Sequence, residues 1–273
     1  MKYEPIKNKI SSAVRSNVFL RKILYSVLNL FLLRAWHVKR SLRKAFKDTR
    51  FASALDAGCG MGEFSYYIFR KFDAEVLGVD ILGEEVIRNS NFASRIASNR
   101  LSFIQADISA KDLPNLLNRK FDLILSVDVM EHIKDDVAVF RNFADLLNNN
   151  GVVIISTPSG SDSEIDNGHK SFVDEHYRDG YSINSLKKKL QSANLRVLST
   201  SYTYGWAGSV YWNLSIKIPM TILNKSDLFF VIIPFYLIIT FPISLIFMAI
   251  DYFFPPSSGG GLLVVATRSS ETI

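Results

Sequence analysis

The chain has 273 residues, of which 48% are hydrophobic and 21% are charged. This length accommodates one domain with accessory segments, and the charged fraction excludes a chain made mostly of membrane spans. A single cysteine, Cys59, excludes an intramolecular disulfide framework and any site built from several cysteines. Such cysteine usage is typical of a reducing compartment.

The net positive charge of the chain comes from the first fifty residues. Residues 1–50 hold 13 of the 32 Lys and Arg residues and two acids, which leaves +11 in this segment and −5 in the remainder. A basic segment binds nucleic acid or an anionic membrane surface. Here the apolar run of residues 18–36 favours a membrane, so we expect no nucleic-acid partner.

That run has a short uncharged core, residues 23–33, which is too short to span hydrocarbon. We therefore expect an amphipathic helix lying in the membrane interface. A helix packed on the following domain and an acid-poor organelle presequence are the alternatives. A cleaved secretory signal is not expected, because basic sequence follows the run without a small-residue cleavage site.

From residue 52 the sequence alternates between apolar strands and amphipathic helices, which is typical of a parallel sheet with crossover helices. The predicted strands begin near Ala52, Ala74, Leu101, Phe121 and Gly151, with further strands at residues 196–204 and 261–269. The predicted helices cover residues 63–72, 84–98, 135–147 and 182–195, the last with Ser182 as its N-cap.

Between the last two predicted strands, residues 228–250 form a run of 23 residues without a charge. The run is long enough to span a bilayer. A single crossing would leave the last strand on the far side, unable to rejoin the sheet. Because Pro234 and Pro242 break the run into short pieces, we predict that residues 209–254 form a re-entrant or interfacial helical pair. A hydrophobic lid or a dimer surface is the alternative.

A glycine-rich motif, LDAGCGMGEFS, follows the first predicted strand and places Gly58, Gly60 and Gly62 before a helix. Glycines there let the backbone approach a ligand closely. Asp80 ends the second strand, where a carboxylate accepts hydrogen bonds from ribose hydroxyls. Asp107 ends the third, where it can take an adenine amino group with Ile108 against the ring. Together these residues predict a nucleoside site.

The spacing disfavours a dinucleotide. The dinucleotide fingerprint needs a third glycine where this chain has Glu63, and a carboxylate there would repel a pyrophosphate. An NAD-dependent oxidoreductase therefore remains a minor alternative.

Four segments in this order resemble the class I S-adenosylmethionine-dependent methyltransferases, especially the group with ubiquinone-biosynthesis and natural-product enzymes. They are the glycine-rich motif, GVDI with Asp80, QADI with Asp107, and residues 126–159. The resemblance implies a three-layer α/β fold with a seven-stranded, mostly parallel sheet and an antiparallel last strand. We accordingly divide the chain into a basic amphipathic arm (1–50), a methyltransferase core (51–208), an apolar membrane-associating insertion (209–256), and the final strand with a tail (257–273).

The resemblance also implies roles for individual residues. S-adenosylmethionine would be the cofactor, with Asp56, Gly58, Cys59, Gly60 and Gly62 at its methionine portion and Asp80 at its ribose. The other implied contacts are Asp107 and Ile108 at the adenine, Ile81 beside Asp80, and Val127 and Asp128 near the sulfonium.

Methyl transfer needs a base only when the acceptor must lose a proton. Three of the four histidines follow the fourth and fifth strands. His132, in MEHI, is given a structural role, whereas His169 and His176 are the candidates for catalysis on the acceptor side. We expect no metal ion.

The apolar insertion stands at the acceptor end of the site. We therefore expect a hydrophobic, lipid-like small-molecule acceptor and a location on the cytoplasmic side of a membrane, peripheral or monotopic. A catalytically silent, cofactor-binding membrane scaffold is the alternative from a different functional class.

Overall fold

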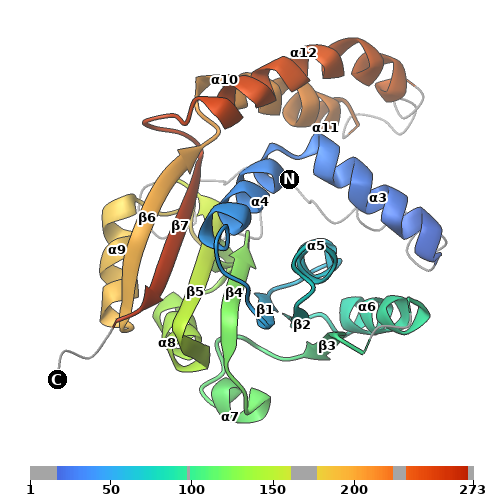
Figure 1. The fold of residues 1–273 in the computed structure, drawn as a ribbon. Helices are drawn as coiled ribbons and strands as arrows, with labels where there is room; N and C mark the ends of the chain where they lie inside the picture. The colour runs from blue at the N-terminus through green and yellow to red at the C-terminus, as the bar shows by residue number, and fades with distance from the viewer. Residues whose placement is uncertain (1–16, 97–98, 161–176, 224–231, 270–273) are drawn as a thin grey trace.

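The computed structural model describes residues 17–96, 99–160, 177–223 and 232–269 (Figure 1). The strands are β1 (Ser53–Ala57), β2 (Glu75–Asp80), β3 (Leu101–Gln105), β4 (Phe121–Val127), β5 (Leu147–Pro158), β6 (Leu195–Thr203) and β7 (Gly261–Arg268). The helices are α3 (Val18–Phe31), α4 (Leu33–Ala45), α5 (Glu63–Phe72), α6 (Gly83–Arg95), α7 (Leu113–Leu117), α8 (Asp136–Leu146), α9 (Ile183–Ser192), α10 (Trp206–Trp212), α11 (Ile218–Leu223) and α12 (Ile233–Phe253). Two short elements complete the fold, the 3-10 helix η1 (Met130–His132) and the π-helix η2 (Asn213–Lys217).

The seven strands form one sheet in the order β3-β2-β1-β4-β5-β7-β6. Six strands are parallel, and β7 lies between β5 and β6 and is antiparallel to both. This arrangement confirms the predicted fold class, including the antiparallel last strand. The carboxyl ends of the parallel strands meet at the end of the sheet that faces α10 and α12 (Figure 1).

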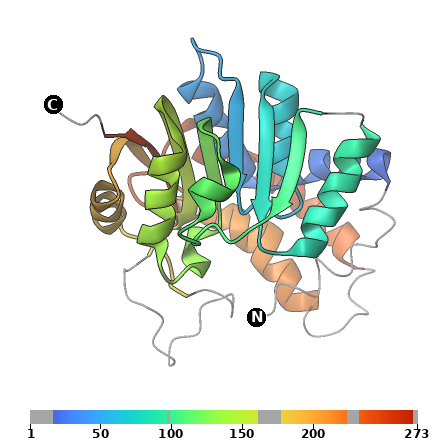
Figure 2. The same cartoon turned by 90° about the horizontal axis from the view of Figure 1, so that it is seen from below.

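Each face of the sheet is covered by helices, because successive strand residues point to opposite faces. On one face, Val38 of α4 and Ile68 of α5 pack in the same cluster as strand residues such as Leu123. On the other, Phe140 of α8 and Leu186 of α9 share a cluster with residues such as Ile124. Seen from the opposite end, the helices flank the sheet as a layer on each side (Figure 2).

The helix boundaries follow from local signals in the sequence. α5 occupies the predicted residues, and the Ser182 side chain caps α9 by accepting a hydrogen bond from the Ser185 N–H. The Asp135 side chain caps α8 in the same manner, accepting from the Ala138 N–H. Such caps satisfy backbone donors that the first turn of a helix leaves without a partner.

The N-terminal apolar run is divided at Leu32 into two helices with different surroundings. Leu32 is extended, with φ −100° and ψ 108°, and this ends α3 and begins α4. α4 lies within the core of the domain, where Leu33, Val38 and Leu42 are fully buried. The predicted run of residues 18–36 is therefore divided, and its last four residues belong to α4, which packs on the sheet as the alternative of a packed helix had it. α3 keeps an exposed apolar side.

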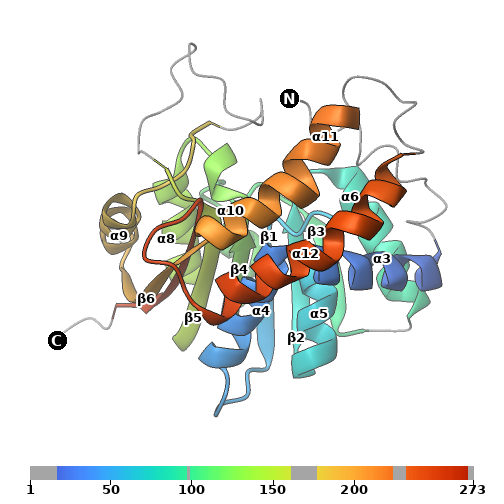
Figure 3. The same cartoon turned by 90° about the horizontal axis from the view of Figure 1, so that it is seen from above.

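The predicted helical pair between β6 and β7 is present. α10, η2 and α11 follow one another without a gap, and α12 packs along α10 and η2. Figure 3 shows α10 and α12 lying side by side across the carboxyl end of the sheet. The chain then returns to form β7, as the fold requires.

The prolines do not divide the second helix, contrary to the prediction. α12 is continuous over 21 residues, with Pro234 in its first turn and Pro242 inside it. Pro234 needs no N–H there, because the first-turn donors have no intrahelical acceptor. Pro242 removes one helical hydrogen bond, and packing along α10 and η2 maintains the helix despite this loss.

A buried carboxylate joins α12 to the rest of the domain. The Oδ2 atom of Asp251 accepts hydrogen bonds from the N–H groups of Gly205 (2.7 Å) and Gly208 (3.1 Å) at the start of α10. Its Oδ1 atom lies 2.9 Å from Nε2 of His37 in α4. One side chain therefore ties together three helices that are far apart in the sequence.

We predict that Asp251→Ala lowers the free energy of unfolding by about 3–5 kcal/mol, the usual loss when one partner of a buried pair is removed. Asp251→Asn is the matched control, since its amide oxygen still accepts from backbone N–H groups, and it should cost less. Urea denaturation measures both values. An equal, small loss in the two variants would show that the buried carboxylate does not hold α12.

Candidate functional site

The glycine-rich loop connects β1 to α5 at the carboxyl end of the sheet. Gly58, Gly60 and Gly62 all have positive φ angles of 78°, 49° and 74°. The N–H groups of Gly58 and Cys59 donate to the Val79 carbonyl at 2.8 and 2.9 Å, which holds the loop against the end of β2. The buried Cys59 side chain faces the protein interior.

Gly58 also marks a close approach between two loops. A Cβ atom at Gly58 would lie 2.3 Å from a methyl group of Val129, in the loop that follows β4. Val127 ends β4, and Asp128 continues with a φ of 51°. The glycine-rich loop and the loop after β4 are therefore in direct contact.

Asp80 lies at the end of β2 and binds the glycine-rich loop. Its Oδ2 atom accepts from the Gly60 N–H at 2.7 Å, and its Oδ1 atom accepts from the Leu82 N–H at 2.9 Å. Ile81, the next residue, is 63% exposed. A carboxylate oxygen has more than one lone pair, so both oxygens can accept further hydrogen bonds.

β3 brings the next pair of predicted residues to the same edge. β2 and β3 are paired so that Asp80 lies beside Gln105, two residues before Asp107. The exposed Asp107 carboxylate accepts from the N–H and the hydroxyl of Ser109 at 2.8 and 2.7 Å. Ile108 is buried.

Asp56, in β1, is buried beneath the loop. Its Oδ2 atom accepts a hydrogen bond of 2.5 Å from the Ser65 hydroxyl. Burial raises the pKa of Asp56 to about 7, and the hydrogen bonds from Ser65 offset only part of this effect. A nearby cation would therefore lower this pKa and favour the ionised carboxylate.

Two further acids, Glu131 and Glu63, lie after β4 and after the glycine-rich loop. Glu131 follows β4 and is 1% exposed, with its Oε2 atom accepting from the Thr157 hydroxyl at 3.2 Å. Burial raises the pKa of Glu131, and it likewise raises the pKa of Glu63 at the start of α5. Arg34 forms an ion pair with Asp128 and lies near both acids.

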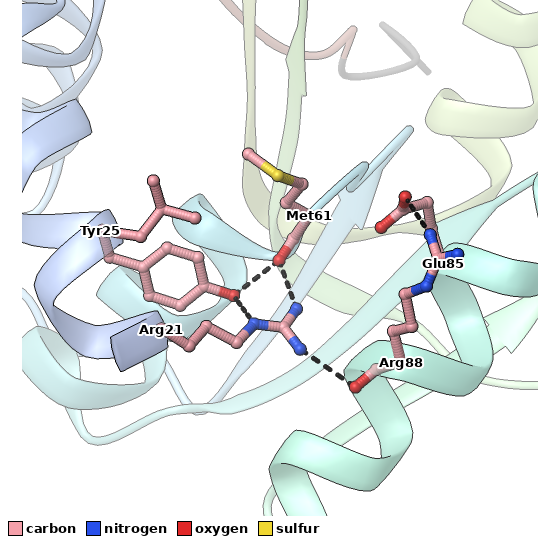
Figure 4. A pocket seen from close by; sticks show the side chains of 6 residues that line it. Arg21, Tyr25, Met61, Glu85 and Arg88 are labelled. Atoms are coloured by element: carbon pink, nitrogen blue, oxygen red, sulfur yellow. Dashed lines mark hydrogen bonds and ion pairs between the residues drawn. The ribbon is translucent and has the colours of Figure 1, made fainter. Parts of the chain in front are cut away.

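α3 lies across the outer side of the glycine-rich loop. The hydroxyl of Tyr25 and Nη2 of Arg21 both donate to the Met61 carbonyl, at 2.5 and 2.6 Å. These groups line a cavity of about 10 Å³, and Nη1 of Arg21 donates to the Arg88 carbonyl at 2.9 Å. Figure 4 shows the side chains that line this cavity. Asn89 also binds the loop, since its Nδ2 atom donates to the Gly60 carbonyl at 2.8 Å.

Sequence reasoning missed these supporting contacts. Arg21 and Tyr25 are four residues apart, which places them on one side of a helix, and this spacing was the available signal. In the sequence, Arg21 interrupts an apolar run and gives no sign of a binding role. In the structure its side chain is 3% exposed and donates to backbone carbonyls. No local pattern indicates that Asn89 binds a loop 29 residues away.

The predicted catalytic residues His169 and His176 lie outside the described residues, so their roles stay predictions. Arg178, which follows them, is buried and forms an ion pair with Asp136. Tyr181 and Lys189 also bind Asp136, both at 2.7 Å, so this segment is part of the domain's internal support. Within the described ranges, no group of three or more His, Cys, Asp or Glu side chains is placed to hold a metal ion.

Comparison with known proteins identifies the family to which this geometry belongs. Residues 31–200 match the sequence profile described as "Methyltransferase domain". Phosphoethanolamine N-methyltransferase 1 of Triticum aestivum is 29% identical over 139 residues, 51% of this chain and 27% of that protein. A ubiquinone biosynthesis O-methyltransferase of Neisseria meningitidis is 31% identical over 111 residues, 40% of this chain and 45% of that protein.

A solved structure described as a putative sarcosine dimethylglycine methyltransferase from Galdieria sulphuraria has a similar fold. Its TM-score is 0.55 at 17% identity, over 88% of this chain and 85% of that chain. The aligned segments span less than half the length of the two curated relatives. The chain belongs to the methyltransferase-domain family, within the class I S-adenosylmethionine-dependent methyltransferases.

We predict that Gly58→Ala destabilises the ligand-free protein more than Gly60→Ala does. Both glycines have positive φ, which costs an alanine about 1–2 kcal/mol. Only at Gly58 does the added methyl group collide with Val129, whereas a Cβ at Gly60 meets nothing within 4 Å. Overpacking should add about 1–3 kcal/mol at Gly58. Equal losses in thermal or urea denaturation would contradict the contact between the two loops.

Proposed function

We propose that this chain transfers a methyl group from S-adenosylmethionine to a hydrophobic or lipid-like small molecule at the cytoplasmic surface of a membrane. The observation that carries the proposal is the position of the exposed apolar helix α12 over the same end of the sheet as the glycine-rich loop (Figures 1 and 3). Family membership supports the chemistry, and the apolar helices support the acceptor class and location.

We assign the cofactor contacts to the residues that the fold brings together. Asp80 would bind the ribose hydroxyls, and Asp107 with Ile108 and Ile81 the adenine. Asp56 and the loop from Gly58 to Gly62 would hold the methionine portion, with Val127 and Asp128 near the sulfonium. The structure supports these assignments by joining the glycine-rich loop, the end of β2 and the loop after β4 through direct contacts.

Methyl transfer from a sulfonium to an acceptor is an in-line displacement of an already activated group. Most of the rate acceleration then comes from holding the acceptor atom about 3 Å from the methyl carbon. The acids around the loop suit a cofactor that carries positive charge on its sulfonium and ammonium groups. His169 and His176 stay our candidates for removing an acceptor proton.

The raised pKa of Asp56 gives the cofactor assignment a pH-dependent test. Below pH 7 the Asp56 carboxyl is mostly protonated, and a cationic ligand must displace that proton to bind the carboxylate. Affinity for S-adenosylmethionine should therefore rise between pH 5.5 and 7, by up to about tenfold per pH unit. Calorimetry at several pH values measures this slope.

Asp56→Asn is the control for this slope. It cannot ionise, so its affinity should be weaker at pH 7 and should vary little over the same range. A slope that persists in Asp56→Asn would assign the proton to another group and remove Asp56 from the cofactor site.

The membrane part of the proposal rests on α12. The most apolar 18-residue window of this helix has a mean hydropathy of 2.3, and only 11% of that window is buried. A core helix of a soluble protein would be mostly buried, because large contiguous exposed apolar patches are uncommon in soluble monomers. The exposed side comprises Phe235, Ile238, Ile239, Ile243 and Ile246.

α3 extends the apolar surface. Its exposed apolar residues, Phe19, Leu20, Ile23, Val27 and Leu30, recur at helical spacing on the side opposite Arg21 and Tyr25. Phe31, at the end of α3, stacks on Phe241 of α12 with 3.8 Å between the ring centroids. The two helices therefore meet, and both lie at the carboxyl end of the sheet (Figure 1).

The fold favours a helix that lies in the membrane interface rather than crossing it. β6 leads directly into α10, and β7 begins soon after α12 ends, so both ends of the helical pair join the same sheet. A lipid-like acceptor could then pass from the interface to the site without entering water. The matched relatives are named for phosphoethanolamine and ubiquinone chemistry, which supports a small-molecule acceptor.

We predict that replacing Ile238, Ile239 and Ile246 together by Gln weakens cosedimentation with phospholipid vesicles, because each of these side chains is more than 60% exposed. Cofactor affinity should stay within about twofold. The control variant carries Leu116→Gln and Leu198→Gln, two exposed apolar positions on α7 and β6, and should still cosediment.

Two other outcomes would identify the apolar surface as a lid or as a subunit interface. If wild-type protein does not cosediment and is monomeric, the helical pair acts as a lid. If wild-type protein is a dimer that the three Gln substitutions dissociate, the surface is a subunit interface. Either result overturns membrane binding and leaves the cofactor assignment standing.

A further inference from the structure

The helices that carry the exposed apolar residues also carry charge of one sign. α3 and α4 contain seven Lys or Arg residues and η2 contains one, whereas α3, α4, α10, η2, α11 and α12 together contain a single acid, Asp251. Asp251 is 2% exposed, and its carboxylate is bound by His37 and by backbone N–H groups. The exposed surface of these six elements therefore presents cations without a competing carboxylate.

Lys22 is exposed within the apolar side of α3. Its neighbours Leu20 and Ile23 are 38% and 44% exposed. Arg21, the adjacent cation, is directed to the glycine-rich loop and is 3% exposed. A lysine stem can lie along an apolar surface while its ammonium group reaches a phosphate. Lys22 is therefore placed to meet the headgroups when the apolar side of α3 enters a membrane.

Lys217, in η2, has a similar position beside the helical pair. It is exposed, and Ile218, which follows it at the start of α11, is 38% exposed. The Nζ atom of Lys217 lies 5.7 Å from the centre of the Trp212 ring. Because η2 packs along α12, Lys217 borders the helix whose exposed side is apolar.

The end of α12 joins exposed aromatic residues to further cations. Nη2 of Arg43, in the last turn of α4, donates to the Tyr252 hydroxyl at 3.2 Å, and Lys44 is exposed next to Arg43. Beside Tyr252, Phe253 and Phe254 are 67% and 74% exposed. Exposed aromatic side chains beside cations are typical of segments that lie in a membrane interface.

α9 shows that positive charge alone does not make such a face. It carries Lys187, Lys188 and Lys189, yet it contributes none of the exposed large apolar side chains. Lys189 binds the buried Asp136 at 2.7 Å. The lysines of α9 therefore provide a matched comparison for cations that stand among exposed apolar residues.

The apolar residues decide which polyanion fits these helices. A nucleic acid would pair its phosphates with the cations but would leave Ile238, Ile239 and Ile246 in water. An anionic bilayer matches both features, because apolar side chains enter its acyl boundary while Lys and Arg are attracted to its surface charge. The observations therefore favour phospholipid.

We propose that this face binds anionic phospholipid in preference to zwitterionic phospholipid, through Lys22, Lys44 and Lys217. The apolar side chains anchor the face, and the lysines select the headgroup. The inference rests on the membrane location proposed above and names the class of lipid that the location requires. It depends neither on the acceptor nor on the cofactor contacts.

Cosedimentation of the full chain with two kinds of vesicles measures this preference. One kind is phosphatidylcholine alone, and the other is a mixture of phosphatidylcholine and phosphatidylglycerol. Each cation near an anionic membrane contributes about fivefold in affinity, so wild-type protein should bind the mixed vesicles at least about tenfold more tightly. Added salt should reduce this difference, because it screens exposed charges.

Replacing Lys22, Lys44 and Lys217 together by Gln should weaken binding to the mixed vesicles by about 10- to 100-fold. Binding to phosphatidylcholine should change less than about twofold, since apolar burial does not depend on charge. S-adenosylmethionine affinity, measured by calorimetry, should be unchanged, which would show that the variant is folded.

The matched control replaces Lys71, Lys187 and Lys188 by Gln. These lysines are exposed on α5 and α9, so the control removes the same charge away from the apolar helices and should keep the lipid preference. Equal losses in the two variants would overturn the proposal, because they would attribute the preference to net charge alone. Equal binding of wild-type protein to both kinds of vesicles would overturn it as well and leave the membrane location standing. Binding to neither kind would overturn both.

Discussion

The insertion of β7 between β5 and β6 is the constraint on which the rest of the architecture depends. β7 pairs with β5 over seven residues and with β6 over eight, so it is an interior strand of the sheet. Everything between residues 204 and 260 must therefore leave the sheet and come back to it. A segment as apolar as α12 would otherwise be free to cross a bilayer. Here the helical pair that contains α12 begins after β6 and ends before β7, so both ends of the pair join the same sheet.

This constraint also explains how the apolar helices become part of the site. α12 returns above the carboxyl ends of the strands, and Asp251 joins its last turn to α10 and α4. α4 in turn carries Arg34 to Asp128, next to the glycine-rich loop. α3, the other helix with an exposed apolar side, binds that loop through Arg21 and Tyr25. The surface proposed to meet a membrane and the site proposed to hold the cofactor are built on shared helices.

Much of this could be predicted from the sequence, because the relevant signals are local. Gly58, Asp80 and Asp107 each follow a strand, and the parallel topology brings strand ends together at one edge. The sequence did not reveal the contacts made by α3 and α4. Arg21 and Arg34 looked like interruptions of an apolar run, and their partners lie tens of residues away. The prediction that Pro234 and Pro242 divide the apolar run was wrong, because a sequence pattern does not show that α12 packs along α10. The helix is continuous through Pro242.

The charges of the site separate the cofactor from the acceptor. Burial raises the pKa values of Asp56, Glu63 and Glu131, so these acids would lose part of their charge without a cationic partner. A sulfonium and an ammonium group supply that partner, and a neutral or lipid-like acceptor does not. The acids would therefore be best stabilised when the cofactor is present. An apolar acceptor would gain its affinity from the helical pair instead, since apolar burial, unlike charge pairing, does not depend on ionisation. Under the proposed function, charge pairing would therefore bind the cofactor and apolar burial would bind the acceptor, so different physical forces would hold the two ligands.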